Sequence, residues 1–243
     1  MSGMEKQLPA PIIQAKAVRF RWRQDRPDVL NIPELNIQQG DRLFIRGASG
    51  CGKSSLLALL AGVALPQAGE IIVLDQTINR LSGPGRDHFR ADHIGFVFQL
   101  FNLIPYLSVL ENVILPCRFS QRRKQSALAN SATLEQEALR LLAHLELASP
   151  GMLHSPVTEL SVGQQQRVAT ARALMGSPEI LIADEPTSAL DSDLRESFIR
   201  LLFRECDTFG STLVFVSHDR RMEQLFEQHV TLEEINQAKL DTC

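Results

Sequence analysis

The sequence lacks the features of a membrane-spanning, secreted or nucleic-acid-binding chain. Its longest apolar run, residues 56–65, falls short of the roughly 18 residues that suggest a membrane span. Residues 1–11 lack the apolar centre of a signal peptide. The four cysteines have neither metal-ligand nor redox spacing, which predicts reduced thiols in a cytosolic protein. The net charge of -3 gives no reason to expect a nucleic-acid surface, so we expect a globular chain whose membrane partner, if there is one, is another protein.

A glycine-rich stretch at residues 47–54, GASGCGKS, fits the nucleotide-binding pattern G-x-x-x-x-G-K-[ST] at every fixed position. The residues before it, 42–46, predict a strand, and those after it, 55–61, predict a helix, which is the context that the motif requires. Glycines let the loop turn its N–H groups inward, and the helix start adds the positive end of its dipole, so the two together hold a polyphosphate. An ordinary glycine turn is the alternative, and the complete motif disfavours it.

Within this loop, Lys53 would reach the β- and γ-phosphates, and the Ser54 hydroxyl would bind Mg²⁺. Cys51 fills a variable position of the motif, and a reactive thiol is the alternative interpretation. The residues of this stretch that we expect to bind the nucleotide are Gly47, Ala48, Ser49, Gly50, Cys51, Gly52, Lys53, Ser54 and Ser55.

The pattern of apolar segments predicts an α/β fold. Segments 12–20, 30–37 and 71–74 suggest a small antiparallel layer. Strands at 93–98, 179–183 and 212–217, together with 42–46, alternate with helices such as 191–206, which argues for a parallel sheet. Gly210 fits the end of that last helix.

The middle of the chain has a helical character. Ser108 with Glu111 predicts a helix start, and residues 131–147 carry apolar residues at helical spacing. Residues 81–87 contain Gly83, Pro84 and Gly85 and predict a loop, while residues 122–124 (RRK) predict a solvated stretch, with a headgroup or partner contact as the minor alternative. We expect one domain at 12–232, with a core at about 12–99 and 176–232, a helical insertion at about 100–175, and tails at 1–11 and 233–243.

An apolar strand at residues 180–183 ends in two acids, Asp184 and Glu185. Buried strands seldom end in adjacent carboxylates unless a cation or a reactive group is near. Beside a phosphate loop, Asp184 would hold Mg²⁺ and Glu185 would polarise the attacking water. A solvated strand end is the alternative.

Residues 160–164 read LSVGQ and precede the acidic strand. Taken alone, they predict only a helix over residues 161–175 that Ser161 caps. With the other motifs, however, the sequence resembles the ATP-binding subunits of ABC transporters, from about residue 12 to about residue 232. The signature of that family is LSGGQ, and this chain departs from it at Val162. The resemblance implies a P-loop NTPase sheet core with an antiparallel β subdomain and an inserted α-helical subdomain.

The resemblance also implies roles for other residues. Gln99, at the end of FVFQ, would link Mg²⁺ and the attacking water to the helical insertion. Residues 188–191, SALD, match the D-loop, which ends at Asp191, and His218 matches the switch histidine that contacts the γ-phosphate. Trp22 is the best match to the aromatic residue that stacks on adenine, with Phe20 as the alternative.

The resemblance further implies ATP and Mg²⁺ as cofactors and a homodimer that encloses two ATP molecules. Ser161, Gly163 and Gln164 of one copy would face the ATP held by the other copy. Glu185 would be the general base, while Lys53 and His218 would stabilise charge on the γ-phosphate.

A subfamily follows from residues 94–105, IGFVFQLFNLIP, and 111–113, ENV, which are similar to the lipoprotein-release and macrolide-export group. That group works with integral membrane permeases of the FtsX type, which implies a peripheral location on the cytoplasmic face of the inner membrane. We expect residues 101–107 to form the docking groove for the permease, with core packing as the alternative.

Three other functions compete with an ATPase that drives a permease. A regulator of a non-transport membrane partner, as in cell division, would share the same ATP chemistry. A soluble ABC ATPase of translation or DNA repair is disfavoured by the single nucleotide domain and the acidic net charge. A small-molecule P-loop kinase has no reason to carry LSVGQ and SALD.

Overall fold

A five-stranded parallel sheet forms the centre of the protein, in a computed structural model that describes residues 10–147, 150–187 and 192–238. The strand order is β6-β7-β8-β3-β9, and every neighbouring pair is parallel. The strands are β3 (Arg42–Arg46), β6 (Ile94–Val97), β7 (Ile180–Asp184), β8 (Thr212–Ser217) and β9 (Gln228–Thr231). Since parallel strands point the same way, the segments that follow β3, β6, β7 and β8 all leave from one edge of the sheet.

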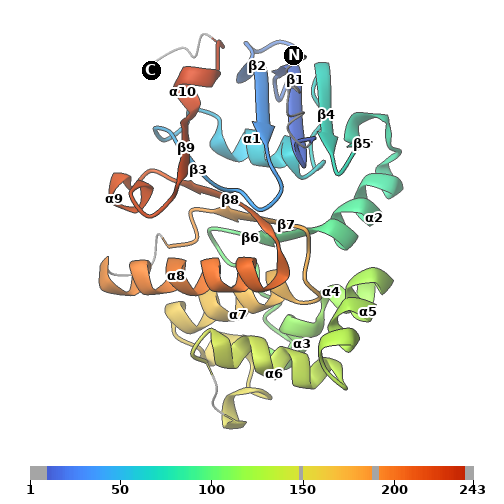
Figure 1. The fold of residues 1–243 in the computed structure, drawn as a ribbon, viewed down its shortest axis with the longest axis vertical. Helices are drawn as coiled ribbons and strands as arrows, with labels where there is room; N and C mark the ends of the chain where they lie inside the picture. Colours follow the sequence, from blue (N-terminus) through green and yellow to red (C-terminus); the bar gives the residue numbers. More distant parts are fainter. Residues whose placement is uncertain (1–9, 148–149, 188–191, 239–243) are drawn as a thin grey trace, which may run out of the picture.

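A second sheet is antiparallel and lies beside the first (Figure 1). It has the order β2-β1-β4-β5, and its strands are β1 (Ile13–Phe20), β2 (Leu30–Ile37), β4 (Ala68–Val73) and β5 (Gln76–Thr77). Helix α1 (Lys53–Leu60) packs between the two sheets, where its leucines are buried. The arrangement confirms the α/β fold with an antiparallel β layer.

The parallel sheet separates two hydrophobic cores. Because successive side chains of a strand point to opposite faces, Phe44 and Phe215 belong to one core, whereas Ile45 and Val216 belong to the other. The second core also holds the antiparallel sheet and α1. Burial on both faces explains why the central strands β7 and β8 are almost entirely apolar rather than alternating, whereas the edge strand β9 is polar.

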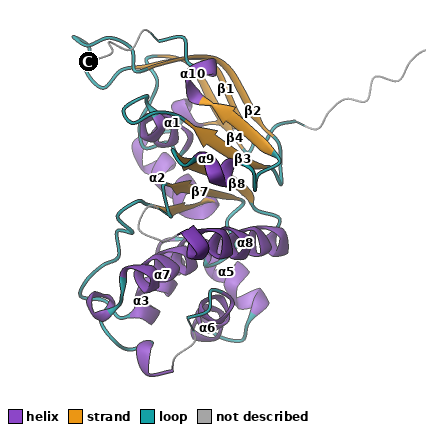
Figure 2. Ribbon diagram, turned by 90° about the vertical axis from the view of Figure 1, so that its left-hand side faces the viewer, coloured by secondary structure: helices purple, strands orange, loops and turns teal. Residues whose placement is uncertain are grey.

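Helices cover the other face of the parallel sheet (Figure 2). They are α3 (Val109–Ile114), α4 (Pro116–Phe119), α5 (Gln121–Asn130), α6 (Leu134–His144), α7 (Val162–Leu174) and α8 (Ser192–Phe209). The remaining elements are α2 (Gly83–His93), α9 (Arg220–Glu223), α10 (Leu232–Ile235) and the 3₁₀ turns Ile78–Arg80, Pro150–Met152 and Val157–Glu159. None of the helices in the described ranges combines the length and the apolarity needed to span a membrane.

Helices α3 and α7 begin at the serines that the sequence predicts as their N-terminal caps. Ser108 and Glu111 form a reciprocal capping box at α3, and Ser161 and Gln164 form another at α7. Both helices therefore begin where the sequence predicts.

Two local expectations are wrong. Of residues 81–87, only 81 and 82 lie outside a helix, because the Ser82 side chain accepts from the Gly85 N–H and Pro84 occupies the first turn of α2, where a missing N–H costs nothing. Residues 122–124 lie in α5, and Arg123 is buried rather than solvated, at 4% exposure. A basic run does not reveal which of its members points inward.

The contact between β6 and α7 depends on the absence of a side chain at Gly95. A Cβ there would lie 2.3 Å from the carbonyl oxygen of Ala173, whereas a Cβ at Gly83 would meet nothing within 4 Å. We expect Gly95→Ala to lower the free energy of unfolding by about 2 kcal/mol or more, because a backbone atom cannot give way cheaply. Gly83→Ala, the control, should stay within about 1 kcal/mol of the wild type. Urea titration followed by circular dichroism measures both, and equal midpoints would contradict this packing.

Candidate functional site

A cavity of ≈ 720 Å³ lies at the edge of the parallel sheet where the strands end. Most of its lining comes from segments that are far apart in the sequence but follow neighbouring strands of the parallel sheet, and Trp22 and Val29 come from the connection between β1 and β2. The lining residues are Trp22, Val29, Ser49, Gly50, Gly52, Lys53, Ser54, Ser55, Gln99, Asp184, Glu185 and His218. The structure thus brings together the phosphate loop, the acidic strand, Gln99 and His218, as the sequence predicts.

The phosphate loop wraps around the start of α1. Gly52 caps this helix with φ at 107°, a left-handed conformation that glycine adopts without a Cβ clash. Lys53 is 7% exposed, and its Nζ donates to the carbonyl oxygens of Gly47 and Ala48, at 2.9 Å each. A buried ammonium and a helix N-terminus therefore face the same small volume, which suits a polyphosphate.

Two carboxylates approach this loop from β7. The Ser54 hydroxyl donates to Asp184 Oδ2 at 3.1 Å. Burial raises the pKa of Asp184, and the charge of Glu185 adds to that rise, although the Ser54 hydrogen bond and Lys53 oppose it. Glu185 has φ at 45°, its N–H donates to the Val216 carbonyl at 2.9 Å, and its carboxylate lies 3.7 Å from Lys53 Nζ. The local backbone therefore directs this side chain toward the loop.

The oxygens at this point fit Mg²⁺. No group of three or more His, Cys, Asp or Glu side chains in the described ranges could hold a metal ion by itself. Mg²⁺, however, is usually held by one or two carboxylates with substrate phosphates and water completing its shell. Asp184 and Ser54, already in contact, supply hard oxygen donors beside the cavity into which Gln99 also faces.

His218 follows β8 and reaches across to the end of β7. Its Nδ1 lies 2.9 Å from Glu185 Oε2, and its side chain is 63% exposed. The general-base candidate and the switch-histidine candidate are therefore paired directly, although the sequence separates them by 33 residues.

The aromatic residue beside the cavity is Trp22. Its side chain is 61% exposed, and its Nε1 donates to Ser55 Oγ at 3.0 Å, which holds the indole against the start of α1. Phe20 is 3% exposed and packs edge-to-face against Trp22, with ring centroids 4.9 Å apart. Trp22, rather than Phe20, thus presents an open ring face to a ligand.

The signature residues do not line this cavity. Ser161, Gly163 and Gln164 start α7, where the Ser161 hydroxyl is occupied in capping, and Val162 is 50% exposed beside them. Residues 188–191, with Asp191, lie outside the described residues. A single copy of the chain therefore does not bring its own signature to its own nucleotide cavity.

Hydrogen bonds from Glu233 in α10 and from Asn236 directly after it support the residues that line the cavity. The sequence analysis did not predict these contacts. Glu233 Oε1 accepts from the Ala48 N–H at 2.7 Å. Asn236 accepts from the Asn31 N–H at 2.8 Å and donates to the carbonyl of Val29, a lining residue, at 3.0 Å. These pairs are separated by about 200 residues in sequence, and no local motif marks either partner.

Comparison with known proteins points to one family. The ABC transporter family model matches residues 30–188. The lipoprotein-releasing system ATP-binding protein LolD of Syntrophotalea carbinolica is 46% identical over 197 residues, which cover 81% of this chain and 83% of that protein. The macrolide export ATP-binding/permease protein MacB of Burkholderia pseudomallei is 37% identical over 217 residues, which cover 88% of this chain and 32% of that protein. The dimeric post-hydrolysis structure of the ATP-binding cassette MJ0796 of Methanocaldococcus jannaschii, bound to ADP and Pi, superposes with a TM-score of 0.78 at 36% identity, over 90% of this chain and 93% of that one.

The phosphate-loop thiol offers a test of the geometry. Cys51 is buried, and burial raises its pKa; Lys53 opposes that rise, and Glu233 adds to it. Because only the thiolate reacts, we expect iodoacetamide at pH 8 to modify Cys51 at least ~10-fold more slowly in the native protein than in urea. Peptide mass spectrometry over time measures the rate at this residue. Equal rates in the two conditions would show that the thiol is accessible and that this loop differs from the conformation described.

Proposed function

The chain belongs to the ABC transporter family, and from that premise we propose that two copies of it enclose two ATP molecules and drive an integral membrane permease. As a member of this family it is an ATP-binding, ATP-hydrolysing subunit. The observation that carries the proposal is the division of the site: the phosphate loop, acids and histidine share one cavity, while the signature lies elsewhere on the same chain.

In this proposal each residue of the cavity acts on a separate part of ATP. Trp22 stacks on adenine through its open face, and the loop N–H groups with Lys53 bind the β- and γ-phosphates. Ser54 and Asp184, with Gln99, hold Mg²⁺, which when bound neutralises phosphate charge.

Hydrolysis in this proposal depends on the pair at the ends of β7 and β8. Glu185 orients the attacking water and takes its proton. His218, held at 2.9 Å by that carboxylate, stabilises charge on the γ-phosphate together with Lys53. Because Glu185 contacts both Lys53 and His218, its carboxylate is held in place before the nucleotide arrives.

The second copy supplies the signature. Ser161, Gly163 and Gln164 lie at the exposed N-terminus of α7, which offers N–H donors to a phosphate across an interface. The related MJ0796 cassette is dimeric in its ADP- and Pi-bound structure, which supports a head-to-tail homodimer for this chain. Asp191 of the D-loop motif would belong to the same interface.

The names of the relatives support a membrane permease as partner. One relative is the ATP-binding protein of a lipoprotein-releasing system, and another joins ATP-binding and permease functions in one protein for macrolide export. An FtsX-type permease would place this chain peripherally on the cytoplasmic face of the inner membrane.

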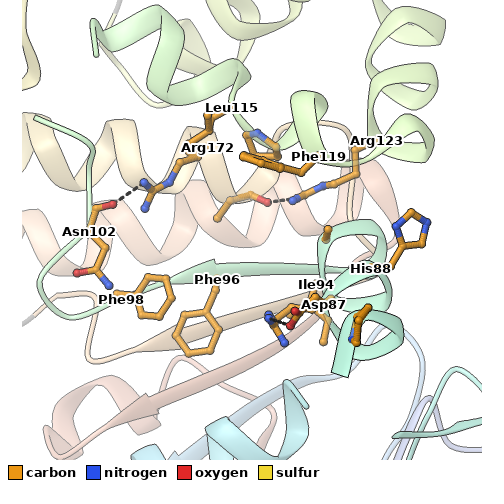
Figure 3. Close-up of a pocket in the computed structure, with 15 residues that line it drawn as sticks. Asp87, His88, Ile94, Phe96, Phe98, Asn102, Leu115, Phe119, Arg123 and Arg172 are labelled. Carbon is orange, nitrogen blue, oxygen red and sulfur yellow. Dashed lines mark hydrogen bonds and ion pairs between the residues drawn. The ribbon is translucent and has the colours of Figure 1, made fainter. Parts of the chain in front are cut away.

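The docking surface expected at residues 101–107 needs correction. Phe101 is 8% exposed, and Leu103 packs against the hydrophobic core, so neither forms an open apolar surface, whereas Tyr106 in the same stretch is 84% exposed. A groove of ≈ 670 Å³ lies instead between α2 and β6 on one side and α4 and α5 on the other (Figure 3). This groove is where we propose that the permease docks.

A substitution at Glu185 tests the catalytic assignment and the dimer together. Glu185→Gln keeps the size of the side chain and removes the base, so turnover should fall by about 10²-fold or more. ATP should still bind, because the phosphate loop is unchanged, and the closed dimer should accumulate. Size-exclusion chromatography at high protein concentration should show a dimer with ATP and Mg²⁺ and a monomer with ADP. Wild-type turnover in Glu185→Gln would remove this residue from the chemistry.

Ser161 provides the matched test of the opposite copy. In the Glu185→Gln background, Ser161→Arg should abolish the ATP-dependent dimer because a bulky cation enters the interface. Ser161→Ala, the control, also removes the helix cap, at a cost of about 1 kcal/mol, without adding bulk. Fluorescent ATP-analogue binding should be equal in both variants, since Ser161 lies outside the cavity. A dimer that survives Ser161→Arg would place the interface elsewhere.

A further inference from the structure

The C-terminal segment, residues 232–238, contacts the surroundings of the nucleotide cavity at two separate points. It begins where β9 ends and contains α10, which lies beside β2 (Figure 1). Leu232 is fully buried in the same hydrophobic core as the leucines of α1, so the start of the segment is anchored in the protein interior. The two contacts therefore come from a fixed part of the fold.

The pairing of β9 with β3 produces the first contact. Arg46 and Thr231, the last residues of these parallel strands, are paired in register. Ala48 and Glu233 each follow two residues later, so the phosphate loop and α10 leave the sheet side by side. The Glu233 carboxylate accordingly accepts from the Ala48 N–H at 2.7 Å.

The peptide unit between Gly47 and Ala48 is held from both sides. Its carbonyl accepts from Lys53 Nζ at 2.9 Å, and its N–H donates to Glu233. A Cβ at Gly47 would lie 3.2 Å from the Glu233 carboxylate, so the missing side chain lets this acid approach the loop closely. Burial acts to raise the pKa of Glu233, but hydrogen bonds from the Ala48 N–H and the Cys51 thiol hold it below its ordinary value. The acid is thus an ionised acceptor at neutral pH.

The second contact is with the connection between β1 and β2, which carries Trp22. Asn236 accepts from the Asn31 N–H at 2.8 Å and donates to the Val29 carbonyl at 3.0 Å. The Val29 N–H in turn donates to the Phe20 carbonyl at 2.8 Å, which closes the connection at its base. One end of the segment is therefore tied to the phosphate loop, and the other end to the connection that carries the exposed indole.

A site binds more tightly when its groups are ordered before the ligand arrives, because the entropy of ordering them is not lost on binding. We infer that Glu233 and Asn236 are positioning residues for ATP, Glu233 for the triphosphate through the loop and Asn236 for the adenine through the connection that carries Trp22. This inference rests on the proposed function, since it takes the cavity as the site of ATP. Neither residue lines the cavity, so each acts through the backbone that it holds.

Two ligands separate the two ends of the site. Inorganic tripolyphosphate has the phosphates of ATP without the base, and displacement of a fluorescent ATP analogue from the full chain, in excess Mg²⁺, measures the affinity of each ligand. Glu233→Ala should weaken both ligands by about 5-fold. Asn236→Ala should weaken ATP by about 5-fold and leave tripolyphosphate within about 2-fold. The same response of the two ligands to both substitutions, or no response, would overturn the inference.

Two further variants separate positioning from loss of charge. Glu233→Gln keeps an oxygen that accepts from the Ala48 N–H, so both affinities should return to within about 2-fold of the wild type. Glu234→Ala, the control, removes a carboxylate from the same helix but not the one that Ala48 contacts, and both affinities should be unchanged. No rescue by Glu233→Gln, or an equal loss in Glu234→Ala, would show an effect of charge alone and overturn the inference.

Cysteine reactivity shows whether the effect is local. Cys51 lies in the phosphate loop, whereas Cys206 of α8 is buried in the core on the other face of the parallel sheet. In native Glu233→Ala, iodoacetamide should modify Cys51 at least ~3-fold faster than in the wild type, because burial then raises the pKa of this thiol without the contribution of Glu233. The rate at Cys206 should not change. A parallel rise at Cys206 would show that the whole fold is loosened and would overturn the positioning role.

The wild-type chain separates this inference from the proposed function. If it does not bind the fluorescent ATP analogue, the proposed function fails. If it binds the analogue but tripolyphosphate does not displace it, the loop does not hold the triphosphate by itself, and this inference fails alone. It also fails alone if the wild type binds both ligands and the two alanine variants respond alike.

Discussion

Parallel strand pairing is the constraint on which the site depends. Because β7, β8 and β3 run side by side in one direction, the acids after β7, His218 after β8 and the phosphate loop after β3 leave the sheet at the same edge. Strand alternation then places separate hydrophobic cores on the two faces of the sheet, so the edge is held rigidly from both sides. The hydrogen bonds of the cavity, such as that between His218 and Glu185, follow from this geometry.

Charged side chains that are wholly or partly removed from solvent are a feature of both the cavity and the groove. In the cavity, Asp184 is a half-buried carboxylate whose pKa is raised by desolvation, although Ser54 and Lys53 oppose the rise, and a cation relieves that cost. In the groove the sign is reversed, because Arg123 and Arg172 are buried without carboxylate partners among the described residues.

The segment after β6 joins the two sites. Phe98 lines the groove, and the next residue, Gln99, lines the nucleotide cavity. Arg172 holds the same segment through the carbonyls of Phe101 and Asn102. Arg172 of α7 is therefore tied to backbone that lies only a few residues beyond Gln99 in the sequence.

Local patterns in the sequence were sufficient for the phosphate loop, the acidic strand and the capped starts of α3 and α7, because each depends on residues that are near neighbours along the chain. They also predicted the apolar strands of both sheets, but not the two-residue β5 or the polar edge strand β9. They failed for α2, where a proline and two glycines fit a first helical turn, and for Phe101 and Arg123, whose burial depends on α7 and its neighbours. Tertiary structure alone decided that Trp22 rather than Phe20 presents an open face, that Glu233 contacts Ala48, and that the signature lies away from the cavity. The reason is that burial and pairing between distant segments are set by the packing of the whole chain, which no short motif encodes.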